Sequence, residues 1–305
     1  MVESITIKNI ETEEKLIMDK MNTKDYVLEY VDWGQAAVNQ YTSKFVNQVG
    51  ISVNGTSFKE RNIEIVGIII ANSEEEMVER KKFLNSFINP QKQYEAIYKQ
   101  YKIVFYPLTS IKYTNTDDKE NNEVICKFKI SGICPNPLFA LNDIETLELE
   151  KIQSAFKFPF HTSEEMGAIF GIEIISDNKR RVIVNRGQVD IGVRFKFVNA
   201  TGNPEEVVYP VLYNFTTGQK FEVKRVMWPS QYIEVDTNIG SKSIVGGYLW
   251  ATQKDNYFKY KTLESDWITL KVGENLIGYG AERNEDLLTV ILEVDNRFME
   301  VQECY

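Results

Sequence analysis

The chain has 305 residues, and its 44 acidic and 35 basic side chains leave a formal net charge of -9 at pH 7. Phosphate binding requires clustered Lys and Arg, so this balance excludes adhesion to nucleic acid or to anionic lipid. No run approaches the roughly 18 apolar residues of a membrane span, and the first residues lack a secretory signal. We therefore expect a soluble chain, not bound to a membrane, that is made in a cytoplasm.

The length and the residue types predict two β-rich domains. Single domains cluster near ~100 to 150 residues, so this chain allows two domains, each with its own core. The 17 Phe and 16 Tyr, together with few long helical periods, favour packed sheets. We predict a mainly β protein with one short helix, divided near residue 145 into residues 1–144 and residues 145–305.

The first seventy residues are typical of strands. Ser4–Lys8 predicts a short strand, and Tyr26–Trp33 predicts an edge strand that runs into a loop. Asn54-Gly55 is the dipeptide most favoured in tight hairpin turns. Arg61–Ile70 alternates at first and is then continuously apolar, as expected of a central strand that is covered on both faces.

A capped helix follows this strand. Ser73 and Glu76 form a capping box, in which the hydroxyl accepts from a backbone N–H and the carboxylate reaches back. Asn89-Pro90 ends the helix, which should lie on a sheet; a membrane-binding or partner-binding helix is the alternative. The apolar stripe that faces the sheet consists of Met77, Phe83, Leu84, Phe87 and Ile88.

The stretch from Lys102 to Phe139 predicts a long hairpin arm. Its first strand, residues 102–106, is apolar, and its second strand, residues 124–130, alternates apolar residues with lysine. The polar tip, residues 114–123, cannot order itself alone, so the arm needs a neighbour to pack on. The candidate contacts to a neighbouring subunit are Ile103, Phe105, Tyr106, Phe128 and Ile130, with Cys126 on the same face.

The second half predicts a β-sandwich. Residues 143–150 form a charged, alternating segment that we interpret as a connector. From Phe156 onward, short strand patterns are separated by turn residues, which is typical of all-β sandwiches. The clearest predicted strands are 193–198, 221–226, 232–236, 266–270 and 287–294.

The sequence offers no constellation for catalysis. Nucleophilic triads need a histidine base, and the single histidine, His161, has no nucleophile motif nearby. The densest acidic cluster, Asp117, Asp118, Glu120 and Glu123, falls in the polar tip, whereas glycoside hydrolysis needs two carboxyls at a fixed separation. We interpret the cluster as a solvated loop, with catalysis and calcium binding as alternatives. We predict that the protein is not an enzyme.

Metal and cofactor sites are not indicated either. Cys126, Cys134 and Cys304 lack the CxxC spacing of a zinc site, so we expect reduced thiols. No glycine-rich phosphate cradle occurs in the sequence. We therefore predict no metal and no cofactor.

Three aromatic residues of the second domain are candidate contacts to a sugar or to a partner protein. They are Trp228, Trp250 and Tyr257, because large aromatic side chains dominate interfaces as well as cores. For each of them, packing inside the domain is the favoured interpretation and ligand contact is the alternative. A fourth residue, Trp267, lies in an apolar strand and is predicted to belong to the core.

The ordered set of these features resembles the distal tail proteins of long-tailed bacteriophages, which form a ring at the end of the tail tube. In the first half, the resemblance rests on the capped helix after an apolar strand, on the predicted arm and on its exit, Cys134–Phe139. In the second half, it rests on Phe156–Phe160, Val184–Gly187, Tyr209–Asn214, Thr216–Gln219, Ile233–Thr237 and Ser265–Asn275.

The resemblance covers nearly the whole chain and implies an assembly role. It implies a six-fold ring of first domains, each a β-barrel or sandwich with the arm as its belt, and a galectin-like β-sandwich as the second domain. The implied partners are further copies of the chain, the tail tube protein, the tail hub protein and receptor-binding or baseplate proteins at a virion tail tip. DNA would pass through the lumen without specific binding.

Two points leave alternatives open. The glycine-rich loop usual before the central strand in this family is reduced here to Gly50 and Asn54-Gly55, which keeps contractile tails and phage-derived bacteriocin particles open. The alternative from another functional class is a carbohydrate-binding module for host cell-wall polysaccharide. A glycan array would distinguish this function from that of a ring protein. A cell-wall hydrolase is the third class, and it would clear host walls in a turbidity assay.

Overall fold

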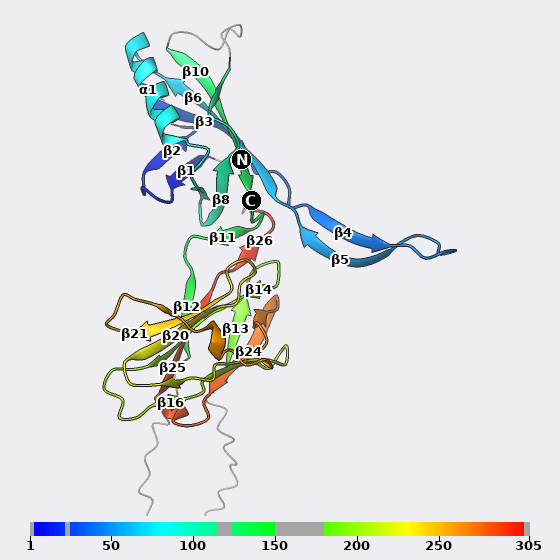
Figure 1. Cartoon of the computed structure of the whole chain (residues 1–305). Coiled ribbons are helices and arrows are strands. Elements are labelled where there is room, and N and C mark those ends of the chain that lie inside the picture. The colour runs from blue at the N-terminus through cyan, green and yellow to red at the C-terminus, as the bar shows by residue number, and fades with distance from the viewer. Residues whose placement is uncertain (1–2, 22–24, 115–123, 150–179, 302–305) are drawn as a thin grey trace, which may run out of the picture. The chain divides into compact units, whose positions relative to one another are not determined.

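The computed structural model describes residues 3–21, 25–114, 124–149 and 180–301 (Figure 1). Residues 115–123 of the predicted polar tip, with the acidic cluster, lie outside these ranges, as do Phe156–Phe160, His161 and Cys304. The described chain divides into two compact units: one spans Ile144–Asn296, and the other joins the residues before this range to the segment from Arg297 onward. The sequence prediction placed that last segment in the second domain, which is wrong, because Phe298 packs in the first core.

The first unit is built on a closed barrel of seven strands. β10 pairs with β6 along its whole length and also reaches β8 at Gly132 and Ile133, which closes the sheet on itself. The barrel strands are β1 (Ser4–Asn9), β2 (Lys15–Asp19), β3 (Asp25–Asp32), β6 (Arg61–Ile70), β7 (Tyr94–Tyr98), β8 (Tyr101–Pro107) and β10 (Ile125–Cys134). Three short strands extend this sheet: β9 (Lys112–Tyr113), β11 (Phe139–Leu141) and β26 (Arg297–Phe298).

Two expectations for this half need correction. β3 is not an edge strand, because it lies between β2 and β6 in the sheet. Asn54 and Gly55 do not form a turn either, because both lie inside β5 (Ser52–Phe58). There Tyr41 faces Gly55 and Thr42 faces Val53, so Asn54 is the extra residue of a bulge. A bulge tolerates the same residue types as a turn, and the dipeptide alone does not distinguish the two.

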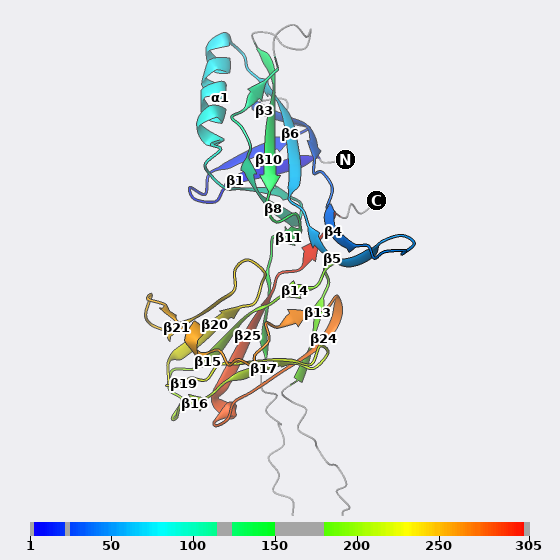
Figure 2. The ribbon, with the colours of Figure 1, turned by 45° about the vertical axis from the view of Figure 1, so that its right-hand side comes forward.

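Helix α1 (Glu74–Phe87) confirms the predicted capped helix. The Ser73 side chain accepts from the Glu76 backbone N–H at 3.2 Å. The Glu76 carboxylate accepts from the backbone and side chain of Asn72, one residue before the expected position. Figure 2 shows the helix beside β3, β6 and β10, and its side chains Met77, Leu84 and Phe87 are buried in the first core.

The predicted arm does not stand apart from its own domain. Ile103, Phe105, Phe128 and Ile130 are all buried inside the barrel, and Cys126 is buried with them. The sequence pattern was right for the strands but wrong for their partner, because β10 pairs mainly with β6 and only briefly with β8.

The outward side chains of β10 are also satisfied within the unit. Lys127 binds Glu29 at 2.7 Å, and Lys129 forms an ion pair with Glu64. Tyr106, the remaining candidate of the arm, is half-buried, and its hydroxyl accepts from the Gln93 side chain. These residues therefore pack within the barrel of their own unit.

The segment Arg297–Val301, which we call the return segment, completes the first core. Its strand β26 pairs with β11, with Phe298 opposite Phe139. The Phe298 ring meets that of Tyr101 edge to face at 5.4 Å. Arg61, which is completely buried, donates to the Met299 carbonyl oxygen. Residues from both ends of the described chain therefore share one core.

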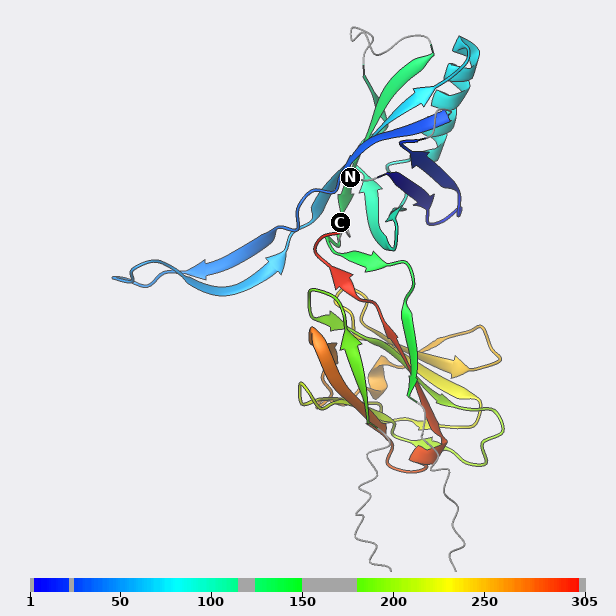
Figure 3. The ribbon, with the colours of Figure 1, turned by 180° about the vertical axis from the view of Figure 1, so that it is seen from behind.

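The second unit is a β-sandwich (Figure 3). Its larger sheet has the order β12 (Glu145–Leu149), β25 (Leu288–Val294), β15 (Arg194–Asn199), β20 (Gln231–Asp236), β21 (Ser243–Tyr248) and β22 (Asp255–Asn256). The smaller sheet has the order β13 (Arg180–Asn185), β24 (Gly273–Gly280), β17 (Val211–Asn214) and β18 (Gln219–Glu222). Two pairs complete it: β14 (Ile191–Gly192) with β23 (Thr269–Leu270), and β16 (Val207–Val208) with β19 (Val226–Met227).

The core of this unit draws on both sheets, for example Phe195 from the larger and Phe221 from the smaller, whose rings lie 5.5 Å apart. The expected connector is itself a strand, because β12 pairs with β25 along its length and buries Leu149 in this core. The predicted strands at 193–198, 232–236 and 287–294 match β15, β20 and β25 within a residue.

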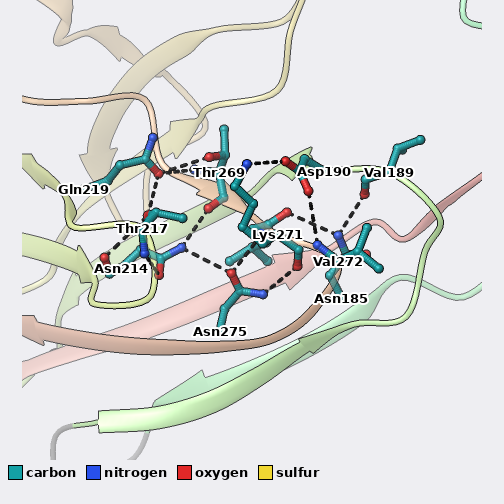
Figure 4. A network of polar contacts seen from close by, with 11 residues as sticks. Asn185, Val189, Asp190, Asn214, Thr217, Gln219, Thr269, Lys271, Val272 and Asn275 are labelled. Atoms are coloured by element: carbon teal, nitrogen blue, oxygen red, sulfur yellow. Dashed lines mark hydrogen bonds and ion pairs between the residues drawn. The ribbon is translucent and has the colours of Figure 1, made fainter.

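A buried polar network holds β23 against the smaller sheet (Figure 4). The Asn275 amide donates to the carbonyls of Lys271 and Gly273, while its oxygen accepts from the Lys271 N–H. Asn214 donates to the Thr269 carbonyl, and Asn185 donates to that of Leu270. Since buried amides need partners, the backbone groups of residues 269–273 satisfy the three asparagine side chains.

Candidate assembly and binding surfaces

A hairpin of the first unit extends away from the barrel (Figures 1 and 3). It consists of β4 (Val38–Ser43) and β5 (Ser52–Phe58), which pair only with each other and form a separate two-stranded sheet. We call residues 38–58 the projecting hairpin. Both of its outer edges carry unpaired backbone groups, which are templates for pairing with another chain.

The projecting hairpin also exposes apolar side chains on its strands and its tip. Val49 is 100% exposed and Val46 is 93% exposed. Residues 35–58 contain a single charged side chain, Lys44, in a chain where a quarter of the residues are charged. The exposed apolar side chains are Val38, Tyr41, Phe45, Val46, Val49, Ile51, Val53 and Phe58.

These properties are those of an interface. An isolated two-stranded hairpin is marginally stable in water, and depletion of charge distinguishes the centres of protein interfaces from the rest of a surface. The sequence prediction missed this hairpin because its apolar residues are irregularly spaced. The long run with a single charge was the signal available at that stage.

A second surface lies at one end of the sandwich and contains two of the three predicted aromatic contacts. Trp250 is 76% exposed and Trp228 is 57% exposed. The Trp250 ring stacks on that of Tyr248, with centroids 5.1 Å apart. The Leu249 N–H donates to the Ser230 carbonyl at 2.8 Å, which brings the turn after β19 beside the turn after β21.

Tyr257, the third predicted contact, is buried and belongs to the support of this surface. Its ring lies under the guanidinium of Arg225, whose central carbon is 4.0 Å from the ring centroid. Burial raises the pKa of Tyr257, while Arg225 acts in the opposite direction. Trp267, predicted as core, is partly buried and packs on Phe221 at 5.4 Å between ring centroids.

The described residues contain no group of three His, Cys, Asp or Glu side chains placed to hold a metal ion. Cys126 and Cys134 are buried free thiols. Of the helices in the described ranges, none is long and apolar enough to cross a membrane.

Residues 15–130 match the model of the phage tail protein RIFT-related domain. This match covers most of the barrel together with helix α1 and the projecting hairpin. The first unit therefore contains a region that is similar to a domain of phage tail proteins.

Solved structures of phage tail components share the fold. The Dit protein of phage SPP1, described as a paradigm of the hub adsorption apparatus in phages infecting Gram-positive hosts, matches with a TM-score of 0.64. The identity is 10%, over 95% of this chain and 98% of that chain. The resemblance to distal tail proteins is thereby confirmed at the level of the fold.

Two structures of the phage p2 baseplate in its activated conformation, with Sr and with Ca, match with TM-scores of 0.49 and 0.47. Their identities are 15% and 16%, and each alignment covers 96% of this chain and 98% of the other. No curated protein matches the chain by sequence.

Proposed function

We propose that the protein is a structural component of the tail tip, where six copies form a ring through their first units. The ring would join the tail tube to the tail hub and anchor receptor-binding or baseplate proteins. The observation that carries this proposal is the projecting hairpin, an exposed and nearly uncharged two-stranded sheet with both edges open. A neighbouring copy would cover the apolar side chains and pair the edges.

Ring closure explains why such a hairpin is tolerated. In a closed ring each hairpin meets the next copy, so that no exposed edge remains to start an open fibre. The fold similarity to the Dit protein of phage SPP1 supports this role. The net charge of -9 per chain would disfavour sticking of DNA to a lumen lined with the same sign.

The proposal is tested by changing the tip of the projecting hairpin without touching the barrel core. The tip variant combines Phe45→Asn, Val46→Ser, Val49→Asn and Ile51→Thr. Light scattering and negative-stain images should show rings of six for the wild-type chain at high concentration. The tip variant should remain a monomer, and its unfolding by urea should be unchanged.

A matched control places polar residues at two exposed sites of the second unit, Ile239→Ser and Leu263→Ser, and should assemble like the wild type. A wild-type chain that stays monomeric at high concentration, even with the tail tube protein present, would contradict the ring. If the tip variant forms normal rings, the projecting hairpin is not part of the interface between copies.

A second candidate function is saccharide binding by the second unit. Exposed Trp228 and Trp250 favour it, because aromatic faces are suitable for stacking on sugar rings. Saccharide binding is compatible with a ring and does not require one. A glycan array with the purified chain separates it from a purely structural role.

A further inference from the structure

The surface around Trp250 is built from two adjacent turns. The turn after β21 is closed by the Ala251 N–H, which donates to the Tyr248 carbonyl at 3.0 Å. The turn after β19 is closed in the same way, because the Gln231 N–H donates to the Trp228 carbonyl at 3.1 Å. We call the side chains of Trp228, Tyr248, Leu249 and Trp250 the aromatic surface; all four are exposed.

Glycines under this surface let the chain fold back tightly. A Cβ atom on Gly247 would lie 2.9 Å from the Gln253 carbonyl oxygen, and one on Gly246 would lie 2.3 Å from the Tyr257 ring. The strand β22 then pairs with β21 through Val245 and Asn256. Trp250 is therefore presented on a short turn that is fixed at both ends and supported by a buried aromatic ring.

The composition of the surface indicates the chemistry of its ligand. Its three segments, residues 199–203, 226–231 and 246–253, contain no charged residue. Ser230 and Thr201 are joined through their hydroxyls at 3.0 Å, and Gln253 adds an amide nearby in sequence. Hydroxyls and amides both donate and accept, which matches the hydroxyl groups of an uncharged sugar.

The size of the surface argues against a protein partner. A stable protein interface takes about 20 to 30 residues from each side, whereas this surface has four large side chains and a few polar neighbours. A charged ligand would lack a counter-charge in these segments. A short stretch of pyranose rings, with apolar C–H faces and polar edges, fits both the extent and the neutrality of the surface.

We propose that the aromatic surface binds a neutral saccharide, with sugar rings stacked on Trp250 and Trp228. This inference rests on the second candidate function above and is independent of ring formation. It assigns Tyr248 to holding the Trp250 ring in place and Tyr257 to supporting the turn from below. Neither of these tyrosines needs to touch the sugar.

The experiment uses the full chain on an array of neutral oligosaccharides of hexoses and N-acetylhexosamines, followed by tryptophan fluorescence titration with the best binder. Trp250→Ala should weaken binding about tenfold or more, because it removes the aromatic face on which one sugar ring stacks. Trp250→Phe should retain part of the affinity. Leu263→Ala, at a fully exposed site outside the surface, should bind as the wild type does.

Three binding results would overturn the inference. They are an array with no neutral binder, a Trp250→Ala variant that binds as tightly as the wild type, and a preference for charged glycans only. Thermal melts show whether the variants are folded, which is expected at a site 76% exposed. Light scattering on the same samples reports ring formation separately, so that failure to bind sugar and failure to assemble are told apart. Loss of assembly in Trp250→Ala would assign the surface to a protein contact instead.

Discussion

The guanidinium carbon of Arg61 lies 4.7 Å from the ring centroid of Phe139. The Arg61 side chain is completely buried, donates to the Met299 carbonyl and lies 3.8 Å from the Glu300 carboxylate. Its Nε and Nη1 atoms are buried without a hydrogen-bond partner. Burial lowers the pKa of Arg61, and the nearby carboxylate of Glu300 acts in the opposite direction. One side chain thus joins β6, β11 and the return segment.

This geometry predicts that Arg61→Lys destabilises the first unit more than Arg61→Met. Lysine retains a buried charge but lacks the flat group that stacks on Phe139, so we expect a loss of about 2 kcal/mol or more. Arg61→Met removes the buried charge together with the unpartnered Nε and Nη1 atoms. The loss of stability in this variant should therefore be smaller. Hydrogen exchange of first-unit peptides in urea measures both. A methionine variant less stable than the lysine variant would contradict the prediction.

The return segment predicts that two nearby positions stabilise different units. Phe298→Ala removes a ring from the first core and should destabilise the first unit by about 3–5 kcal/mol. Val294→Ala, four residues earlier, removes two methyl groups from the second core and should destabilise only the second unit. Hydrogen exchange followed separately in the two units is the readout. Effects of both variants on the same unit would disprove the assignment.

The cap of helix α1 predicts a local loss of stability. Ser73→Ala leaves the Glu76 N–H without its acceptor and should cost about 1 kcal/mol. Ser86→Ala in the same helix removes an exposed hydroxyl that donates to the Phe83 carbonyl, and it should cost less than about 0.5 kcal/mol. Urea unfolding of the two variants, side by side, tests the difference. Equal losses would show that the cap contributes nothing specific.

Buried ionisable groups predict that the first unit loses stability in alkali. Burial raises the pKa of the Cys134 thiol to about 12, although Arg61 opposes the shift. An unfolded thiol ionises near its ordinary pKa of about 8.5, so above that pH the unfolded state releases a proton that the folded state keeps. The stability that the protonated Cys134 thiol contributes to the folded state is therefore fully present below pH ~8.5. It is lost as the pH rises toward 12.

Tyr26 and Tyr113 add to this loss at higher pH, because burial raises the pKa of each to about 12 from an ordinary value of 10.0. Between pH 8.5 and 10 the thiol dominates, with a slope of at most about 1.4 kcal/mol per pH unit. Cys134→Ala should therefore flatten the fall of the free energy of unfolding in this window. Equal slopes for variant and wild type in urea titrations would refute the role of Cys134.

The parts of the fold that sequence predicted are those with local causes. Ser73 and Glu76 start a helix through bonds within one turn, and the alternation in residues 125–134 specifies a strand with one buried face. The partner of that strand is not local. The same alternation suits a hairpin arm and a barrel wall, and only the pairing of β10 with β6 along its whole length distinguishes them.

The binding surfaces were predictable in part. Trp228 and Trp250 are exposed as the sequence suggested, whereas Tyr257 is buried because Gly246 leaves room for its ring. The projecting hairpin was missed because its two strands bury no residue within the chain. Its irregular apolar pattern follows from that, and no periodicity marks it.

The bond between Arg61 and Met299 also sets an order of events during synthesis. The two residues are 238 positions apart, and ribosomes add ~5–20 residues per second, so roughly 10 to 50 s separate their appearance. Throughout that interval the first unit lacks the strand that covers Phe139, although nearly all of its other residues already exist. A chain interrupted within the second unit therefore lacks the return segment, and the first core stays incomplete although all seven barrel strands are present.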